Sequence, residues 1–177
     1  MNAEVIENGL KGVLGREVRF LGCFHEKDLL EIISREKGVF VCIVLVGGES
    51  ASVGHWIGLY VNHYFNKIGY FDSYNLPPSS YSTILVRYIN MKKDYEVCSL
   101  NFRLQSNHSY VCGAYAMLFV YLISHHNLNM VLSFFKKKFS RHSYFENDKL
   151  ILRLCYSLFK MPPCIKTFCL GETKYIC

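Results

Sequence analysis

The hydrophobic pattern of the chain changes between strand-like and helix-like periods. Val39 to Val46 is an unbroken apolar run rich in β-branched residues, too short for a helix, and it predicts a central buried strand. The runs His55 to Val61 and Ile68 to Asp72 flank a short polar turn, Asn62 to Lys67, and predict a β-hairpin. Gly47 to Val53 reads as a flexible loop that leads into this hairpin.

The other segments favour helices, because their apolar residues recur at helical spacing. The sequence predicts helices over Ala3–Leu14 (ending at Gly15), Glu26–Arg35 (closed by Gly38), Tyr81–Met91, Val111–His125, Met130–Phe139 and Asp148–Phe159, a further strand over Tyr95–Leu104, and an irregular tail from Pro162-Pro163. No repeat or linker divides the chain. We therefore expect one α+β domain over residues 1–177, with a mixed sheet flanked by helices.

The junction between a polar loop and an apolar segment, within Gln105 to Ile123, carries candidate chemistry. Cys112 and Gly113 stand where the predicted buried helix begins. The first N–H groups of a helix have no intrahelical partner, and the helix dipole adds partial positive charge there, so a thiolate at Cys112 is stabilised. Gly113 offers no side chain to block approach to the sulfur, and Gln105 can direct an amide N–H at a developing oxyanion.

A nucleophilic cysteine needs a base and a group that orients the base. His55 and Asp72 lie at strand ends of the predicted hairpin. If the turn is centred between His63 and Tyr64, the two residues lie directly opposite each other, with Cβ atoms about 4.5–5.5 Å apart. One hairpin would then hold both groups.

Each of these residues has an alternative interpretation, which is either a structural role or a different catalytic base. Cys112 taken alone is more often a core cysteine than a catalyst. His108 is a rival base because it is close to Cys112 in sequence, but it lacks an obvious carboxylate partner, whereas His55 has Asp72. We expect Trp56 to be a packing wall beneath the imidazole rather than a reactive group, and Gln105 could merely cap the helix or brace its loop.

The motifs together resemble the adenovirus-type cysteine proteases (adenain), distant relatives of the SUMO-specific proteases. The resemblance lies in the order His55, Asp72, Gln105, Cys112, in the dipeptides HW and CG, and in the segments FVCIVLV, GHWIGLYVNHYFNKIGYFD and QSNHSYVCGAYAMLFVYLI. It is strong from Phe20 to Ile123 and weak beyond. Adenain carries Glu where this chain has Asp72, while the SUMO proteases carry Asp.

This resemblance implies a viral cysteine endopeptidase with a papain-related fold, whose nucleophile begins a buried central helix. It implies a triad of Cys112, His55 and Asp72, with Gln105 and the Cys112 N–H as oxyanion donors, and no cofactor required for the chemistry. The implied substrates are virion precursor polypeptides cut after Gly, and the implied location is the virion and the host nucleus. Cys98 would correspond to a cysteine that adenain joins to an activating viral peptide by a disulfide. We expect the protein to be a monomer.

The charge is uneven along the chain. The net charge of +6 arises after residue 130, because the residues before it hold equal numbers of acidic and basic side chains. The basic residues of this last part include Lys136, Lys137, Lys138, Arg141, Lys149, Arg153 and Lys160. They can follow phosphates or form a solvated helix surface, and the two readings are even from the sequence alone. The resemblance favours DNA, which activates adenain-like proteases.

Composition bears on whether the chain is a membrane, secreted or metal-binding protein. The chain is 51% hydrophobic, enough for a full core, yet no apolar run is long enough for a convincing membrane span. The amphipathic, acid-containing amino terminus is unlike a secretory signal, so we expect a reducing compartment and free thiols. Cys164, Cys169 and Cys177 lack paired zinc-ligand spacing, so we expect no metal. A deSUMOylase or deubiquitinase, a related acyltransferase and a non-enzymatic DNA-binding protein remain alternatives.

Overall fold

The computed structural model describes residues 1–47, 54–160, 165–169 and 172–176, the last two ranges by their backbone only. Apart from Gly47, the predicted loop over Gly47 to Val53 lies outside the described residues, as does Pro162-Pro163. The elements in chain order are α1 (Ala3–Leu10), β1 (Arg19–His25), η1 (Glu26–Asp28), α2 (Leu29–Ser34), β2 (Val39–Val46), β3 (His55–Asn62), β4 (Lys67–Phe71), η2 (Pro78–Ser80), α3 (Thr83–Met91), β5 (Glu96–Ser99), α4 (Cys112–Ile123), α5 (Leu128–Phe139), α6 (Tyr144–Phe159), β6 (Ile165–Cys169) and β7 (Glu172–Ile176).

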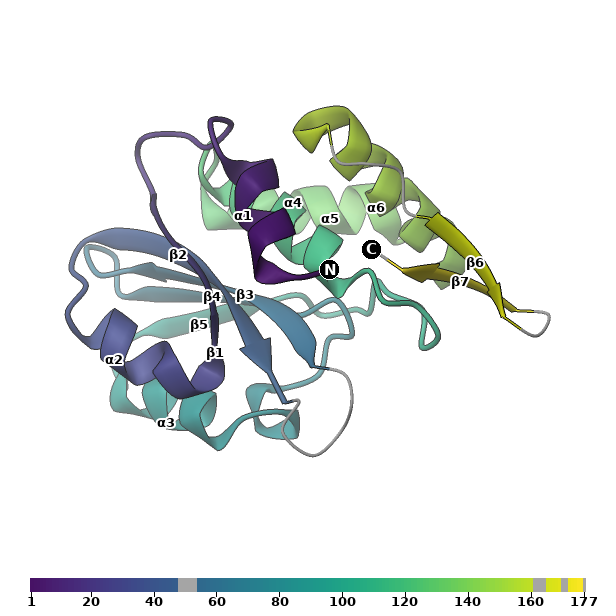
Figure 1. Cartoon of the computed structure of the whole chain (residues 1–177). Coiled ribbons are helices and arrows are strands. Elements are labelled where there is room, and N and C mark those ends of the chain that lie inside the picture. The colour runs from purple at the N-terminus through teal and green to yellow at the C-terminus, as the bar shows by residue number, and fades with distance from the viewer. Residues whose placement is uncertain (48–53, 161–164, 170–171, 177) are drawn as a thin grey trace.

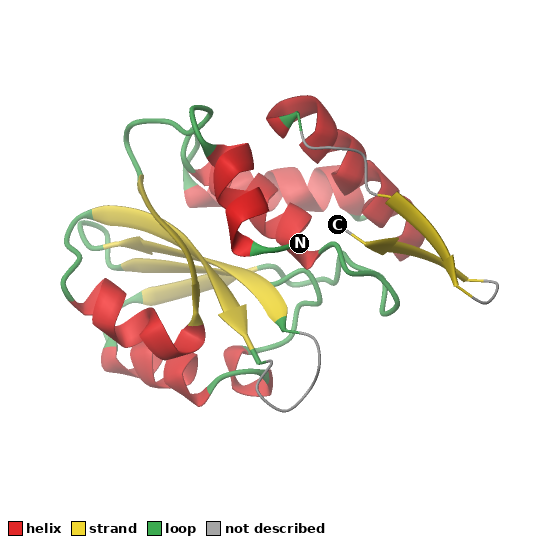
Figure 2. Ribbon diagram, in the orientation of Figure 1, coloured by secondary structure: helices red, strands yellow, loops and turns green. Residues whose placement is uncertain are grey.

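The main sheet is mixed and has the order β1-β2-β3-β4-β5. The outer pairs, β1 with β2 and β4 with β5, are parallel, whereas β2, β3 and β4 form an antiparallel centre. Helices α2 and α3 cover one face of this sheet, and α1 and α4 lie on the other side together with α5 and α6 (Figures 1 and 2). The predicted α+β class with a helix-flanked mixed sheet is confirmed.

The two faces of the sheet build two hydrophobic clusters. Along β2, Val41 and Ile43 pack into the cluster of α1, α4, α5 and α6, while Phe40 and Cys42 pack into the cluster of α2 and α3. Both faces of the strand are therefore covered, which is why its sequence is apolar without alternation. The predicted buried strand is confirmed at its full length.

Helix α4 forms the centre of the larger cluster, with ten of its twelve residues buried. It lies against β3 through a close approach at Gly58, where an added Cβ would come within 2.5 Å of the Phe119 ring. Phe119 in turn stacks on Phe71 of β4, with ring centroids 4.7 Å apart. The close approach of Phe119 to Gly58 fixes α4, which begins at Cys112, against β3, which begins at His55.

Replacing Gly58 by alanine is expected to lower the free energy of unfolding by about 1–3 kcal/mol, because the methyl group overpacks a buried contact. Phe119 is fully buried and stacked on Phe71, so its ring has no open space to enter. Urea denaturation followed by circular dichroism measures the change. Adding Phe119→Leu to Gly58→Ala should recover part of the loss, and an unchanged urea midpoint for Gly58→Ala would contradict the packing described.

Several predicted boundaries are wrong. The first helix ends at Leu10 rather than near Gly15, because Gly12 adopts φ +80° and turns the chain away. Gly15 instead marks a close approach, since a Cβ there would lie 2.0 Å from the Ser124 carbonyl oxygen. The last helix begins earlier, at Tyr144, where Ser143 and Glu146 form a capping box that the sequence analysis missed.

Two strand predictions also differ from the structure. The strand expected over Tyr95–Leu104 is only β5, Glu96–Ser99, because the following loop bonds elsewhere: the N–H groups of Leu104 and Gln105 donate to the Ser73 carbonyl at 2.8 and 3.0 Å. The tail expected to be irregular pairs β6 with β7 as an antiparallel hairpin. Strand β1 was not predicted. Within the described ranges, no helix combines the length and apolar character needed to cross a bilayer.

Candidate active site

Cys112 is the first residue of α4, as predicted, and its side chain is only partly buried. Val111, the residue before it, makes no side-chain cap, so the first-turn N–H groups of the helix are open to another acceptor. Burial raises the pKa of the Cys112 thiol, but a hydrogen bond and the charge of His55, together with the backbone N–H groups of Trp56 and Gly113, outweigh it. The net effect is a pKa below the usual value, which favours the thiolate.

His55 begins β3, and its Nε2 lies 2.6 Å from Oδ1 of Asp72. The predicted register is wrong by two positions: Gly58 pairs with Phe71 and Asn62 with Lys67, which centres the turn between Tyr64 and Phe65. A register shift of two positions leaves each side chain on the same face of the sheet. His55 therefore still contacts Asp72, as a diagonal neighbour just beyond the last paired residues of the two strands.

Asp72 follows β4 at a tight turn that its own side chain organises. Oδ1 accepts the Tyr74 N–H at 3.0 Å in addition to His55, and Oδ2 accepts the Leu76 N–H at 2.7 Å and the Tyr81 hydroxyl at 3.3 Å. Asn75, in the same turn, has φ +58°, a conformation that asparagine tolerates. Four donors thus fix a buried carboxylate in front of the imidazole.

The His55 imidazole is held as a cation. Burial lowers its pKa, but the hydrogen bonds and charges of Asp72 and Cys112 together outweigh burial and raise the pKa to about 9. Since Asp72 occupies Nε2, the nitrogen left for Cys112 is Nδ1. A lowered thiol pKa and a raised imidazole pKa both favour the thiolate–imidazolium pair over the neutral thiol and imidazole.

Two tyrosine rings stack on the imidazole. The ring centroids of Tyr74 and Tyr81 lie 4.9 and 5.1 Å from that of His55, with interplanar angles of 29° and 23°. Tyr81 was predicted inside a helix but lies just before α3, whose N-cap is Ser82, and this leaves its ring free to cover His55. The two rings restrict rotation of the imidazole.

Gln105 lies beside this group but is fully buried and bonded on every side. Its Oε1 accepts the Ser73 hydroxyl at 2.6 Å, and its Nε2 donates to the Tyr74 hydroxyl at 3.1 Å and to the Ser109 carbonyl at 2.8 Å. The structure therefore brings Gln105 to the site but engages its amide with protein partners.

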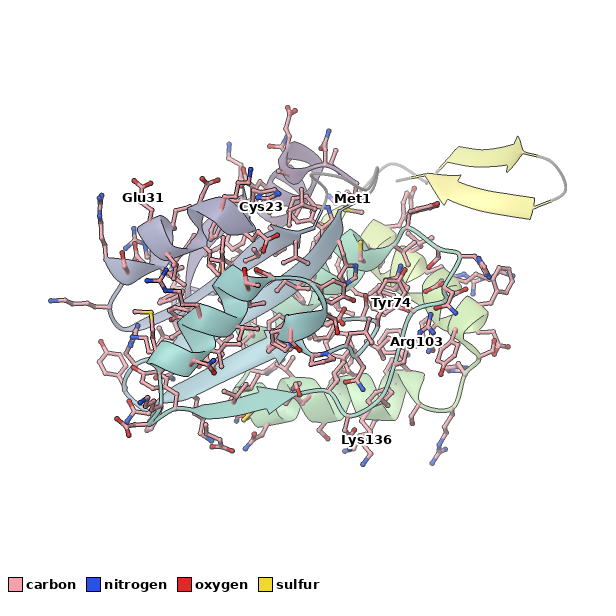
Figure 3. The ribbon with its side chains drawn as sticks, turned by 90° about the horizontal axis from the view of Figure 1, so that it is seen from below. Met1, Cys23, Glu31, Tyr74, Arg103 and Lys136 are labelled. Atoms are coloured by element: carbon pink, nitrogen blue, oxygen red, sulfur yellow. The ribbon has the colours of Figure 1, made fainter. Side chains whose placement is uncertain are left out.

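The Gln105 loop is held from two sides by charged residues. Arg103 donates from Nε to the Gln105 carbonyl at 2.6 Å, and its guanidinium lies 5.1 Å from the Tyr74 ring (Figure 3). Asp148 of α6 accepts the Ser106 N–H at 3.2 Å and the Tyr115 hydroxyl at 3.2 Å. Burial raises the pKa of Asp148 to about 6, even though these hydrogen bonds favour its charged form.

Gly113 lies against the N-terminal segment of the chain. A Cβ at this position would lie 3.1 Å from Sδ of Met1 and 3.3 Å from Ile6, so the glycine makes room for the N-terminal segment. The Met1 carbonyl also accepts the Trp56 indole N–H at 2.9 Å. Trp56 packs in the larger hydrophobic cluster, whereas the rings that stack on the imidazole are those of Tyr74 and Tyr81.

Two other predicted residues lie apart from this arrangement. The His108 side chain is exposed, and it is not one of the groups that shift the pKa of the Cys112 thiol. Cys98 is half-buried on the edge strand β5, where burial and a hydrogen bond with Glu96 raise the pKa of its thiol. Among the described residues, no group of His, Cys, Asp and Glu side chains is suited to hold a metal ion.

Five residues of this arrangement were not predicted from the sequence: Ser73, Tyr74, Tyr81, Arg103 and Asp148. One pattern could have indicated Tyr74: Asp at the end of a strand, followed by Ser, Tyr and Asn, is typical of a turn in which the Asp side chain bonds the N–H two residues on. No comparable pattern marks Arg103 or Asp148, which reach the loop through tertiary contacts.

Comparison with known proteins gives structural neighbours only. No protein-family model and no curated protein matches the chain. It is similar to a crystal structure of an ASFV protease (18% identity, TM-score 0.47), covering 75% of this chain and 58% of that one. It is also similar to the Ulp1 protease domain in complex with SMT3, the yeast ortholog of SUMO (14%, TM-score 0.48, 90% and 76%), and to ChlaDub1 from Chlamydia trachomatis (12%, TM-score 0.47, 88% and 76%).

The chain spans about half the length of the ASFV protease structures, 44% of one and 58% of the other. Proteases, including a SUMO protease described with a catalytic cysteine, are thus among the structural neighbours. At 12–19% identity the likeness concerns the fold and not the reaction.

Iodoacetamide should label Cys112 before Cys23, Cys42, Cys98 and Cys155 near pH 6.5, because only the thiolate reacts and Cys112 alone among these five has a lowered pKa. Burial raises the pKa of Cys23, Cys42 and Cys155, and Cys98 is raised as well. Mass spectrometry of tryptic peptides measures the order of labelling. His55→Ala should slow labelling of Cys112 at least about tenfold, and faster labelling of the half-buried Cys98 would contradict the ion pair.

Proposed function

We propose that this protein is a cysteine endopeptidase of the adenain type, which cleaves peptide bonds through Cys112, His55 and Asp72. One observation carries the proposal: a cysteine at the start of a buried helix interacts with a histidine whose other ring nitrogen lies 2.6 Å from a buried carboxylate. Nucleophile, base and orienting group in this order are what acyl transfer by a thiol requires.

In the first half of the reaction, the Cys112 thiolate attacks the scissile carbonyl carbon and a C–S bond forms. As the tetrahedral intermediate collapses, the C–N bond breaks and the His55 imidazolium gives its Nδ1 proton to the leaving amine. Asp72 holds Nε2 throughout, and the Tyr74 and Tyr81 rings limit rotation of the imidazole. The products of this half are a free amine and a thioester on Cys112.

In the second half, neutral His55 removes a proton from water, which attacks the thioester carbonyl. The C–S bond breaks, the carboxylic acid leaves, and the thiolate and imidazolium are restored. The backbone N–H of Cys112 and the Gln105 side chain are the proposed donors to the oxyanion in both halves. Gln105 can serve only after one of its present hydrogen bonds opens.

The finer parts of the proposal rest on the resemblance of the sequence. We propose virion precursor polypeptides as substrates, cleavage after Gly, and action in the virion and host nucleus. Activation by a peptide through Cys98 and by DNA are further proposals. The DNA proposal is supported by the exposure of the basic residues of α5 and α6, among them Lys136 (Figure 3).

A substrate panel tests the proposed reaction. The wild-type protein should hydrolyse short fluorogenic peptides with Gly-X-Gly at the cleavage site, and should cleave SUMO and ubiquitin conjugates at least about tenfold less efficiently. An endopeptidase binds an extended peptide, whereas a deSUMOylase or deubiquitinase needs contacts with a folded modifier. Fluorescence release gives kcat/KM for each substrate, with Cys112→Ala as the control.

Other outcomes would reassign the function. Preference for a SUMO or ubiquitin conjugate over the peptides would favour the isopeptidase alternative. Transfer of the acyl group to an added amine, without the mass of one water in the donor product, would favour an acyltransferase. No turnover on any of these substrates, with DNA binding unaffected by Cys112→Ala, would favour a non-enzymatic protein.

A further inference from the structure

The hydrogen bonds of Gln105 leave it no free donor. A carboxamide nitrogen carries two hydrogens, and Nε2 of Gln105 has two acceptors: the Ser109 carbonyl at 2.8 Å and the Tyr74 hydroxyl at 3.1 Å. The amide cannot be turned over, because its oxygen would then face the Ser109 carbonyl oxygen, which has no hydrogen to donate. A substrate oxyanion must therefore displace one of the two acceptors.

The Tyr74 hydroxyl is the acceptor that can leave. Its bond to Gln105 is the longer of the two, and the Tyr74 side chain is partly exposed, on the turn between β4 and η2. The Ser109 carbonyl belongs to the loop that Asp148 braces through Ser106. The hydroxyl also has another partner in the substrate-free protein, since it lies 3.3 Å from the Ser109 carbonyl, to which it donates.

Three contacts of Tyr74 do not involve its hydroxyl. The Tyr74 N–H donates to Asp72, the ring stacks on His55, and the Arg103 guanidinium lies over the ring. Loss of the hydroxyl would remove none of these contacts. The Ser109 carbonyl would still accept from Gln105 at 2.8 Å, so no buried acceptor would be left without a donor.

We propose that Tyr74 is a positioning residue that controls the oxyanion donor: its hydroxyl occupies one amide hydrogen of Gln105 in the free enzyme, and the substrate carbonyl oxygen replaces it. This inference rests on the proposed peptidase function and on Gln105 as an oxyanion donor. Each catalytic cycle then begins by breaking a protein hydrogen bond, and the binding of substrate offsets that cost.

Tyr74→Phe tests the inference, because it removes the hydroxyl and keeps the ring. The variant should raise kcat/KM for the Gly-X-Gly peptide by about two- to tenfold, the range of one net hydrogen bond. A peptide aldehyde, which forms a tetrahedral adduct with a thiol, should bind the variant more tightly by a similar factor. A role limited to structural support predicts a loss in both measurements.

A double-mutant cycle assigns the effect to Gln105. Gln105→Met keeps the volume of the side chain but offers no donor, so adding Tyr74→Phe to it should change kcat/KM by less than about twofold. Circular dichroism establishes that each variant is folded, and Gln105→Leu replaces Gln105→Met if the latter unfolds. Tyr156→Phe, at an exposed position on α6, is the matched control and should behave as wild type.

The outcomes separate the two proposals. If the wild-type protein cleaves the peptide and Tyr74→Phe leaves kcat/KM unchanged or lowers it, the proposed control of Gln105 by Tyr74 is overturned. A gain in kcat/KM that persists in the Gln105→Met background would overturn it as well. No wild-type turnover on the peptide panel would overturn the proposed function, and this inference with it.

Discussion

Replacing Cys112 by alanine is expected to reduce peptide cleavage by at least about 10⁴-fold, because it removes the sulfur that forms the thioester. The protein should remain folded, since Cys112 is only partly buried and the helix that it begins is held by the aromatic contacts of Phe119. Hydrolysis of a fluorogenic Gly-X-Gly peptide measures the loss, and circular dichroism measures the fold.

A matched cysteine variant makes the result specific. Cys23 lies on β1, and burial raises the pKa of its thiol, so Cys23→Ala should keep cleavage within about twofold of wild type. If Cys112→Ala retained more than a few per cent of wild-type turnover, the thioester mechanism would have to be abandoned.

Replacing His55 by alanine is expected to reduce cleavage by about 10³-fold or more. The substitution removes the group that lowers the thiol pKa and the proton donor for the leaving amine in one step. It also leaves the buried Asp72 carboxylate without one of its partners. Peptide hydrolysis between pH 6 and 9 measures the loss, and a higher pH should restore part of the thiolate but not the acid.

His108→Ala is the control for the base. This side chain is exposed on the Gln105 loop, so the variant should keep at least about half of wild-type cleavage. The reverse pattern, with His108→Ala inactive and His55→Ala active, would transfer the role of base to His108 and remove the reason for Asp72.

The hairpin shows how far a local pattern can reach. The sequence predicted both strands and placed His55 and Asp72 near each other, because alternation and a polar turn are local features. It missed the register, since a turn centre one residue later moves every cross-strand pair by two positions. The contact survived because a shift of two keeps both side chains on the same face of the sheet.

The state of Gln105 was beyond the reach of the sequence. Its position before Cys112 marked it as an oxyanion donor, but its amide hydrogens are engaged by Tyr74 and Ser109, and its oxygen by Ser73. Two of these partners are more than thirty residues away in the chain, and no periodicity connects them.

The sequence by itself determined the buried strand of β2, the helix that starts at Cys112 and the chemical types of the candidate triad, because periodicity and helix-end preferences act over a few neighbouring residues. The tertiary structure decided which imidazole nitrogen Asp72 holds, which rings cover His55, and which acceptors occupy Gln105. These features depend on hydrogen bonds and packing between loops distant in sequence, whose geometry is set only when helices and strands have packed on the sheet.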